Sequence, residues 1–186
     1  MSVRDIIGPI EGQMQKTLEK MKGDFSTLRT GRASSALLEN LRVDYYGTLT
    51  PINQLANVST PEARTLEIRA WDKGAVQSIE KAIQKSDLGL NPSNDGTVIR
   101  LQIPKLTEER RKDLIRVVRK MSEEYRVSVR NERRDGLEKL KKSEKAKEIT
   151  EDDLKSAEQE IQKMTDLFIK KVDEMLAGKE RDIMEV

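Results

Sequence analysis

The sequence predicts an α+β fold that is mainly α: a long antiparallel three-helix bundle with an inserted small β/α/β domain. Three segments, near residues 7–28, 107–145 and 150–184, carry apolar residues at steps of three and four, which is the period of amphipathic helices. Between the first and second segments, short stretches alternate apolar and polar residues as half-buried strands do. Charged residues make up 37% of the 186 residues, but the periodic apolar positions argue against disorder.

The segment 150–184 gives the clearest helical pattern. Its apolar positions are Leu154, Ala157, Ile161, Met164, Phe168, Val172 and Met175. Thr150 and Asp153 are spaced much as in a capping box, which predicts that the helix begins directly after Thr150. A helix of this length extends roughly 50 Å at 1.5 Å per residue.

The segment 107–145 is predicted to form a second long helix, with Thr107 as its N-cap. One face carries Leu114, Val118, Met121, Tyr125 and Val129. The first segment repeats the pattern from Ile7 to Leu28, and Pro9 predicts a late start or a kink. Three long helices with narrow apolar stripes are best buried against one another, which predicts the bundle.

Residues 31–104 are predicted to form the inserted domain, and residues 1–30 plus 105–186 the bundle domain. A hairpin over 41–51 turns at Gly47, a strand covers 64–71, and a short amphipathic helix covers 73–86. Residues 88–97 are rich in turn formers, and a last strand covers 98–103. The chain therefore crosses between the domains twice, near Gly31 and near Pro104–Lys105, which permits relative motion of the domains.

The composition excludes several classes of protein. Without Cys or His, the chain has no disulfide framework, no structural zinc site and no thiol or imidazole catalyst. It contains no glycine-rich nucleotide-binding motif and no metal-binding loop, so we expect neither enzymatic activity nor a cofactor. No apolar run approaches the roughly 20 residues that span a bilayer, and the N-terminus does not resemble a signal peptide. We therefore expect a cytoplasmic protein without a membrane partner.

Seven basic residues form a stripe on the second predicted helix, opposite its apolar face. This basic ridge consists of Lys112, Arg116, Arg119, Arg126, Arg130, Arg133 and Arg134. Residues 105–145 carry 15 basic and 9 acidic side chains, whereas residues 146–186 carry 7 and 12. Because arginine binds phosphate bidentately, the ridge is a candidate nucleic-acid surface. Pairing within the helix, or with the acidic third helix, would explain the same pattern without a ligand.

A second basic candidate ends the first predicted helix, at Arg29 and Arg32 in the sequence Arg-Thr-Gly-Arg. Basic side chains and a glycine also suit a helix C-terminus, so capping is an alternative role. Because the insert joins the first and second helices, we expect Arg29 and Arg32 to lie near Arg110 and Arg111.

Six motifs follow one another along the chain: RTGRAS (29–34), VDYYGT (43–48), KAI (81–83), SDLGLNP (86–92), LTEERRK (106–112) and VRNERRD (129–135). In this order, and over essentially the whole chain, they resemble the bacterial ribosome recycling factor family. The pair Gly8-Pro9 departs from the family pattern. The resemblance implies an L-shaped, tRNA-like outline for the bundle and its insert.

The resemblance also implies a translation factor that hydrolyses nothing itself. Such a factor binds the post-termination ribosome and contacts large-subunit ribosomal RNA. With elongation factor G and GTP, it splits the ribosome into subunits and releases it from mRNA and deacylated tRNA. The alternatives are a general RNA-binding helical bundle and a coiled-coil scaffold. The sequence gives no sign of self-association, so we expect a monomer.

Particular residues take on roles through the same resemblance. The RNA-binding candidates are Arg29, Arg32, Arg130 and Arg133, then Arg110 and Arg111, with Arg134 added as a member of the ridge. The implied hinge lies at Gly31, Arg32, Pro104 and Lys105, where the two crossings were placed.

Overall fold

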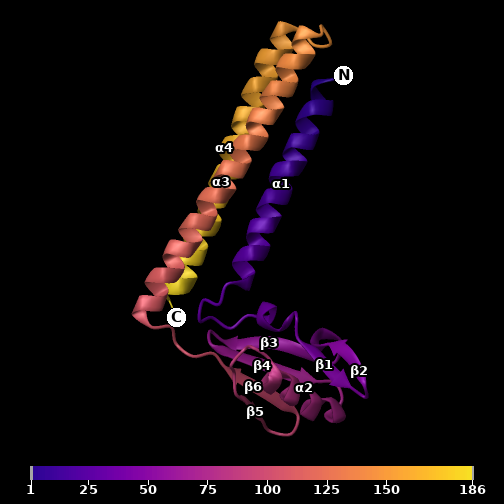
Figure 1. The fold of residues 1–186 in the computed structure, drawn as a ribbon, viewed down its shortest axis with the longest axis vertical. Helices are drawn as coiled ribbons and strands as arrows, with labels where there is room; N and C mark the ends of the chain where they lie inside the picture. The colour runs from indigo at the N-terminus through magenta and orange to yellow at the C-terminus, as the bar shows by residue number, and fades with distance from the viewer. Residues whose placement is uncertain (1, 186) are drawn as a thin grey trace. The chain divides into compact units, whose positions relative to one another are not determined.

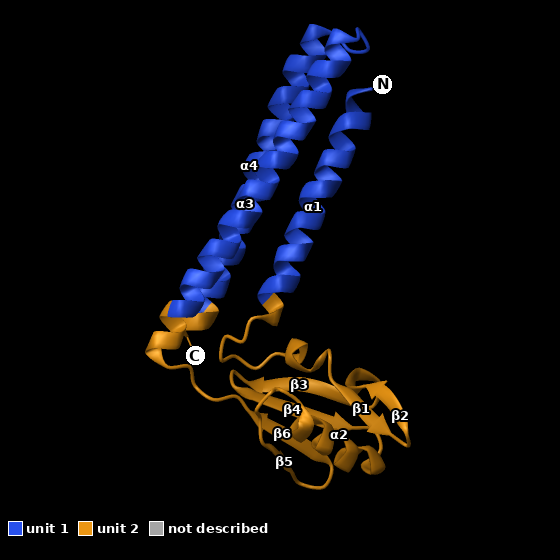
Figure 2. Ribbon diagram, viewed as in Figure 1, with its two compact units in different colours: residues 1–25, 113–181 blue, residues 26–112, 182–186 orange. Residues whose placement is uncertain are grey.

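The computed structural model describes residues 2–185, and the chain divides into two compact units (Figure 2). Unit 1 contains residues 1–25 and 113–181, and unit 2 contains residues 26–112 and 182–186. These divisions fall inside the long helices, whereas the limits expected from the sequence, 1–30 plus 105–186 and 31–104, follow the helix ends. The domain limits therefore stay a prediction.

Three long helices dominate the fold: α1 (Val3–Thr27), α3 (Glu108–Lys145) and α4 (Glu151–Met184) (Figure 1). The N-cap of α4 is the one expected, because the Thr150 hydroxyl accepts the Asp153 amide at 3.1 Å and the Asp153 carboxylate accepts the Thr150 amide at 3.0 Å. The expected late start of the first helix is wrong, since Pro9 lies inside α1. Buried Ile7 and Ile10 on either side of Pro9 hold this turn in the core, which offsets the one helical hydrogen bond that proline cannot donate.

In unit 1, α3 runs antiparallel to both α1 and α4. Side chains of α1 and α3 meet with residue numbers rising on one helix and falling on the other: Thr17 bonds Glu132, and Asp24 bonds Tyr125. Gly136 of α3 lies where all three helices meet. A Cβ there would lie 3.0 Å from Ile161 Cδ1 of α4 and 3.2 Å from Ile10 Cγ1 of α1. The antiparallel three-helix bundle is confirmed.

Unit 2 contains a four-stranded antiparallel sheet, a separate hairpin and one helix (Figure 1). The sheet has the order β3-β4-β6-β5, with β3 (Ala56–Glu62), β4 (Thr65–Ala70), β5 (Pro92–Asn94) and β6 (Val98–Gln102). The hairpin pairs β1 (Arg42–Tyr45) with β2 (Thr48–Pro51), and short 3-10 turns cover Ser35–Leu38 and Ile52–Gln54. The helix α2 (Lys73–Lys85) shares one apolar core with β4 and β6, through Val76, Ile79, Ile83, Leu66, Ile68, Ile99 and Leu101. The expected hairpin, helix and two strands are thus confirmed.

The two edge strands were not predicted. Most side chains of β3 are exposed; the strand contains Pro61, and its pairing with β4 shifts register between Ser59 and Glu62. The strand β5 has three residues and begins with Pro92, inside the segment expected to contain only turns. That expectation is corrected. An edge strand bonds on one side only and tolerates proline, so neither strand needs an alternating apolar pattern.

The chain enters and leaves the sheet of unit 2 beside the same turn. The Ala33 amide donates to the carbonyl of Ala63, and the Ile103 amide donates to the carbonyl of Arg64, both at 2.7 Å. Just before this point Gly31 has a φ of 76°, in the left-handed region that glycine adopts at little cost. The incoming and outgoing segments are therefore fixed side by side, while the hinge itself stays a prediction.

Candidate nucleic-acid interface

The basic ridge lies along α3, and the structure divides it into an inner and an outer row. The inner row contains Arg119, Arg126 and Arg133, which are spaced seven residues apart. Their guanidinium groups donate to side chains of α4: to Glu180 at 2.5 Å, to Asp173 at 2.8 Å and to Gln162 at 3.1 Å, respectively. The inner row therefore fastens α3 to α4. Pairing with the acidic third helix was one of the alternatives left open by the sequence, but the individual partners were not predicted, although the seven-residue spacing of Asp173 and Glu180 was a signal for them.

The outer row pairs within α3 itself. The pairs are Lys112 with Glu108 at 2.9 Å, Arg116 with Asp113 at 3.6 Å, Arg130 with Glu123 at 3.2 Å and Arg134 with Asn131 at 3.4 Å. Exposed pairs of this kind contribute only about 0.5 kcal/mol each and are screened by salt. A phosphate can therefore displace them at little cost, so the outer row is the part of the ridge best suited to a polyanion.

Arg126 joins α3 to α4 and is the residue of the inner row with the strongest set of partners among the described residues, one carboxylate on each helix. Only 19% of its side chain is exposed, and it bonds Asp173 of α4 and Glu123 of α3. Burial lowers the pKa of Arg126, but the hydrogen bonds to Asp173 and Glu123 outweigh burial and raise it. The hydrogen bonds from Arg126 and Arg130 hold the pKa of Glu123 below its usual range. Arg130, with 42% of its side chain exposed, remains open to a ligand.

Arg133 combines exposed and packed atoms. Its Nη1 donates to Gln162, whereas its Nε is buried without a hydrogen-bond partner. Although the ridge was placed opposite the apolar face of the helix, part of the Arg133 guanidinium packs against the bundle. Arg134, one residue further on, is exposed.

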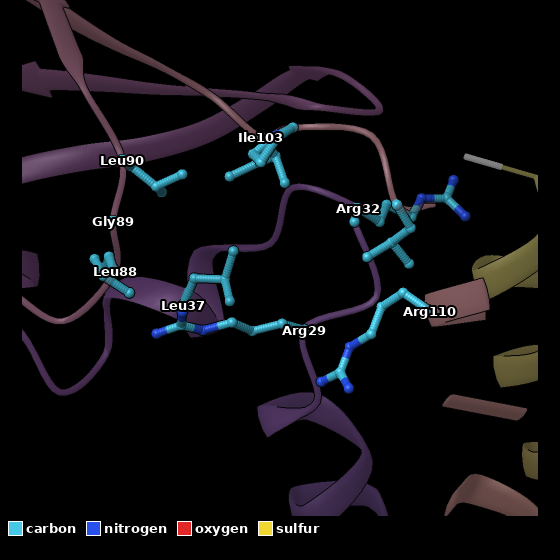
Figure 3. A pocket seen from close by; sticks show the side chains of 11 residues that line it. Arg29, Arg32, Leu37, Leu88, Gly89, Leu90, Ile103 and Arg110 are labelled. Atoms are coloured by element: carbon cyan, nitrogen blue, oxygen red, sulfur yellow. The ribbon is translucent and has the colours of Figure 1, made fainter. Parts of the chain in front are cut away.

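The second basic candidate forms part of a pocket in unit 2 (Figure 3). Arg29, Arg32 and Arg110 line it together with an apolar surface made by Leu37, Leu88, Leu90 and Ile103; Arg29 extends toward Leu37 and Leu88, whereas the guanidinium group of Arg32 points away from them. Gly31 and Pro104, two of the expected hinge residues, also line this pocket, and Lys105 is exposed beside it in the chain. The structure thus brings Arg29, Arg32 and Arg110 together, as the topology predicted.

Two of these arginines have partners within unit 2. Arg29 donates to the carbonyl of Asp87 at 3.2 Å, and Arg32 forms an ion pair with Asp182 at 2.6 Å. Arg111 does not line the pocket and donates to the carbonyl of Met184 at 3.4 Å. The pocket therefore combines basic side chains of two chain segments, residues 29–32 and Arg110, with an apolar floor.

Two tyrosines, each with its hydroxyl bonded to a carboxylate, have raised pKa values. The hydrogen bond to Asp72 raises the pKa of Tyr45 to about 12, and burial together with the hydrogen bond to Asp24 raises that of Tyr125 to about 12. Such values lie far from the neutral range that general acid–base catalysis needs. Within residues 2–185, no group of carboxylates could hold a metal ion, and no helix is long and apolar enough to cross a membrane.

Residues 21–184 match the family described as Ribosome recycling factor. The ribosome-recycling factor of Syntrophomonas wolfei subsp. wolfei is 59% identical over 184 residues, which cover 99% of this chain and 100% of that protein. The chain belongs to the ribosome recycling factor family. The ribosome-recycling factor of Clostridioides difficile is 58% identical over 177 residues, which cover 95% of this chain and 96% of its own. The resemblance seen in the motifs is confirmed.

Solved structures of ribosome recycling factors share the fold. A solution structure matches with a TM-score of 0.78 and 44% identity, over 100% of this chain and 99% of the other. A second is the Thermus thermophilus ribosome recycling factor, described with Escherichia coli elongation factor G bound to the E. coli post-termination complex. It matches with a TM-score of 0.70 and 51% identity, over 98% and 99% of the two chains. Ribosome recycling factors are translation factors, so the family confirms the expectation that the chain is not an enzyme.

Proposed function

We propose that this chain binds the post-termination ribosome and, with elongation factor G and GTP, splits it into subunits. The ribosome is thereby released from mRNA and deacylated tRNA for reuse. The observation that carries this proposal is the 59% identity to a ribosome-recycling factor along essentially the full length of both chains. The factor of known structure that is described with elongation factor G on the post-termination complex supports the choice of partners.

The basic ridge is the proposed contact with large-subunit ribosomal RNA. In the outer row, Arg130 leaves Glu123 and Arg134 leaves Asn131 to bind phosphate oxygens. Arg133 of the inner row binds phosphate through those of its nitrogens that are accessible. Each phosphate neutralised releases counterions, so the affinity falls with salt, at a slope of roughly 0.7 to 0.9 per phosphate. Arg29, Arg32 and Arg110 form a second proposed RNA contact at the pocket, with Arg111 beside it.

The insert is proposed to move relative to the bundle at Gly31–Arg32 and Pro104–Lys105. A stiff bundle on the ribosome and a movable insert would allow a partner to push on the factor without breaking its core. The chain is proposed to act as a cytoplasmic monomer, with GTP hydrolysis supplied by elongation factor G.

The test is sedimentation of the purified chain with vacant ribosomes and isolated subunits across a salt series, beside an unrelated RNA duplex. We expect saturable, salt-sensitive binding to ribosomes and large subunits but not to the duplex, followed by subunit splitting when elongation factor G and GTP are added. Equal binding to the duplex would point to a general RNA-binding bundle. Binding to neither would leave the scaffold, in which the ion pairs between α3 and α4 serve stability alone.

Arg133→Ala and Gln162→Ala give a matched pair in the same assay. Each variant removes the hydrogen bond between Arg133 of α3 and Gln162 of α4, but only Arg133→Ala removes a charge. We expect Arg133→Ala to weaken ribosome binding about tenfold or more, since a charged hydrogen bond contributes roughly 1.5–3 kcal/mol. Both variants should retain the helical circular dichroism signal. Equal ribosome affinity of the two variants, or unfolding of Arg133→Ala, would contradict the proposed role.

A further inference from the structure

A groove lies between α2 and the β1–β2 hairpin of unit 2, away from the residues discussed so far. Its lining combines basic and apolar side chains: Arg42, Lys81 and Lys85, with Leu41, Leu49 and Ala82. Ser78, Ser86 and one carboxylate, Asp44, complete it. We call this feature the α2 groove. Lys81 and Lys85 are four residues apart on α2, so both project from the same face of the helix.

The cations of the α2 groove lack carboxylate partners among the described residues. Arg42 donates only to the backbone carbonyl of Glu39, at 3.2 Å, and neither lysine forms an ion pair. Asp44 accepts the Gly47 amide through its Oδ1 in the hairpin turn and remains a carboxylate, so the lining carries three basic side chains and one acidic side chain. Glu80, which precedes Lys81 on α2, does not pair with it: the Glu80 carboxylate accepts a hydrogen bond from the side-chain amide of Asn94 at 2.7 Å.

Elsewhere in the same unit the basic side chains of the sheet are paired. Arg69 and Arg100 both reach Glu67, and Arg100 also reaches Asp95. Residues 31–104 carry eight basic and eight acidic side chains, so the lining of the α2 groove, with three basic side chains and one acidic, is more basic than the insert as a whole. A local excess of cations attracts an anionic partner.

Leu49 indicates the chemistry of that partner. Its side chain is 71% exposed at the edge of the groove, while Leu41 beneath it is buried. An exposed leucine beside unpaired cations suits a protein segment that carries carboxylates next to an apolar anchor. RNA fits less well, because its sugar-phosphate backbone offers no aliphatic group to cover Leu49 and none of the described residues that line the groove is an aromatic on which a base could stack.

We propose that the α2 groove is a docking surface for an acidic protein segment with an aliphatic or aromatic anchor residue. The carboxylates of the segment pair with Arg42, Lys81 and Lys85, and the anchor covers Leu49. The inference rests on the proposed function in one respect: the partner is sought among the proteins that take part in ribosome splitting. The groove provides a contact that is chemically distinct from the RNA contacts of the basic ridge.

Photocrosslinking of the full chain tests this proposal. A benzophenone-bearing phenylalanine analogue replaces Leu49, and the protein is irradiated with post-termination ribosomes, elongation factor G and GTP, before the products are identified by mass spectrometry. We expect a crosslink to a protein segment rich in Asp or Glu. Its yield should fall at least tenfold in K81E/K85E. The matched control is K16E/K20E, which reverses two exposed lysines at the same spacing on α1 and should leave the yield unchanged.

Three results would overturn the inference: crosslinks to ribosomal RNA alone, crosslinks to a protein segment without carboxylates, or a yield unaffected by K81E/K85E. Co-sedimentation of every variant with ribosomes is measured in parallel. If the chain sediments with ribosomes and splits them but forms no protein crosslink at position 49, the α2 groove is not a docking surface. If no variant sediments with ribosomes, the proposed function fails instead.

Discussion

The carboxylate of Glu132 in α3 is partly buried, and only one of its two oxygens accepts a hydrogen bond. Its Oε1 accepts the Thr17 hydroxyl at 2.6 Å, but its Oε2 is buried without a hydrogen-bond partner. Burial raises the pKa of Glu132, the Thr17 hydrogen bond lowers it, and the nearby Asp135 raises it further, with a net increase. A carboxyl group with a raised pKa in the folded chain stabilises the fold while protonated. That contribution is lost as the pH rises through the folded-state pKa.

We therefore expect Glu132→Gln to be more stable than the parent chain at pH 7, by about 1 kcal/mol, because the neutral amide avoids burying a charge that accepts only one hydrogen bond. The advantage should shrink as the pH falls to about 4, where the parent chain protonates Glu132. Urea unfolding at the two pH values measures the difference. Glu124→Gln, at an exposed position of the same helix, is the control. An advantage of Glu132→Gln that is independent of pH would contradict this reading of the site.

At the scale of the helices, Gly136 fixes how closely the bundle can pack. Its missing side chain leaves room for Ile161 and Ile10, which approach from two other helices. We expect Gly136→Val to destabilise the bundle by about 1–3 kcal/mol, because the added methyl groups overpack a filled core. Gly178→Ala, on α4 with no atom within 4 Å of the added Cβ, should instead stabilise by up to about 1 kcal/mol through helix propensity. Thermal unfolding followed by circular dichroism distinguishes the two, and equal shifts would contradict the packing argument.

The helices could be predicted from the sequence because each repeats its apolar period over many turns, and because α3 and α4 also begin after recognisable N-caps, Thr107 and Thr150. The edge strands could not, since β5 is short and β3 is polar and irregular. The partners of the inner row of the ridge could not be predicted from the sequence either. The periodicity of α3 places Arg119 and Arg126 on one face, but only the register between α3 and α4 shows that this face meets Glu180 and Asp173.

At the scale of the whole molecule, the two units have separate apolar cores. The core of unit 2 surrounds Leu66 and Ile99, whereas a core of the bundle surrounds Ile6 and Ile161. We expect Gly136→Val to lower hydrogen-exchange protection in α3 and to leave the amides of β4 and β6 unchanged, because no side chain of one core belongs to the other. Mass spectrometry of exchanged peptides measures both regions at once. A parallel loss of protection in β4 and β6 would show that the cores open as one.

The hydrogen bonds that fix Ala33 and Ile103 beside the same turn have a consequence for folding. Between α1 and α3 the chain makes a loop of some 80 residues, and closing a loop costs entropy that grows with the logarithm of its length. Once the sheet has formed, those two bonds join the ends of the insert, so that only short segments separate α1 from α3. A loop about tenfold shorter saves about 2 kcal/mol of closure free energy. A folded insert therefore lowers the entropy cost of bringing α1 to α3. If the insert forms early in folding, it favours the packing of α1 against the antiparallel pair α3 and α4.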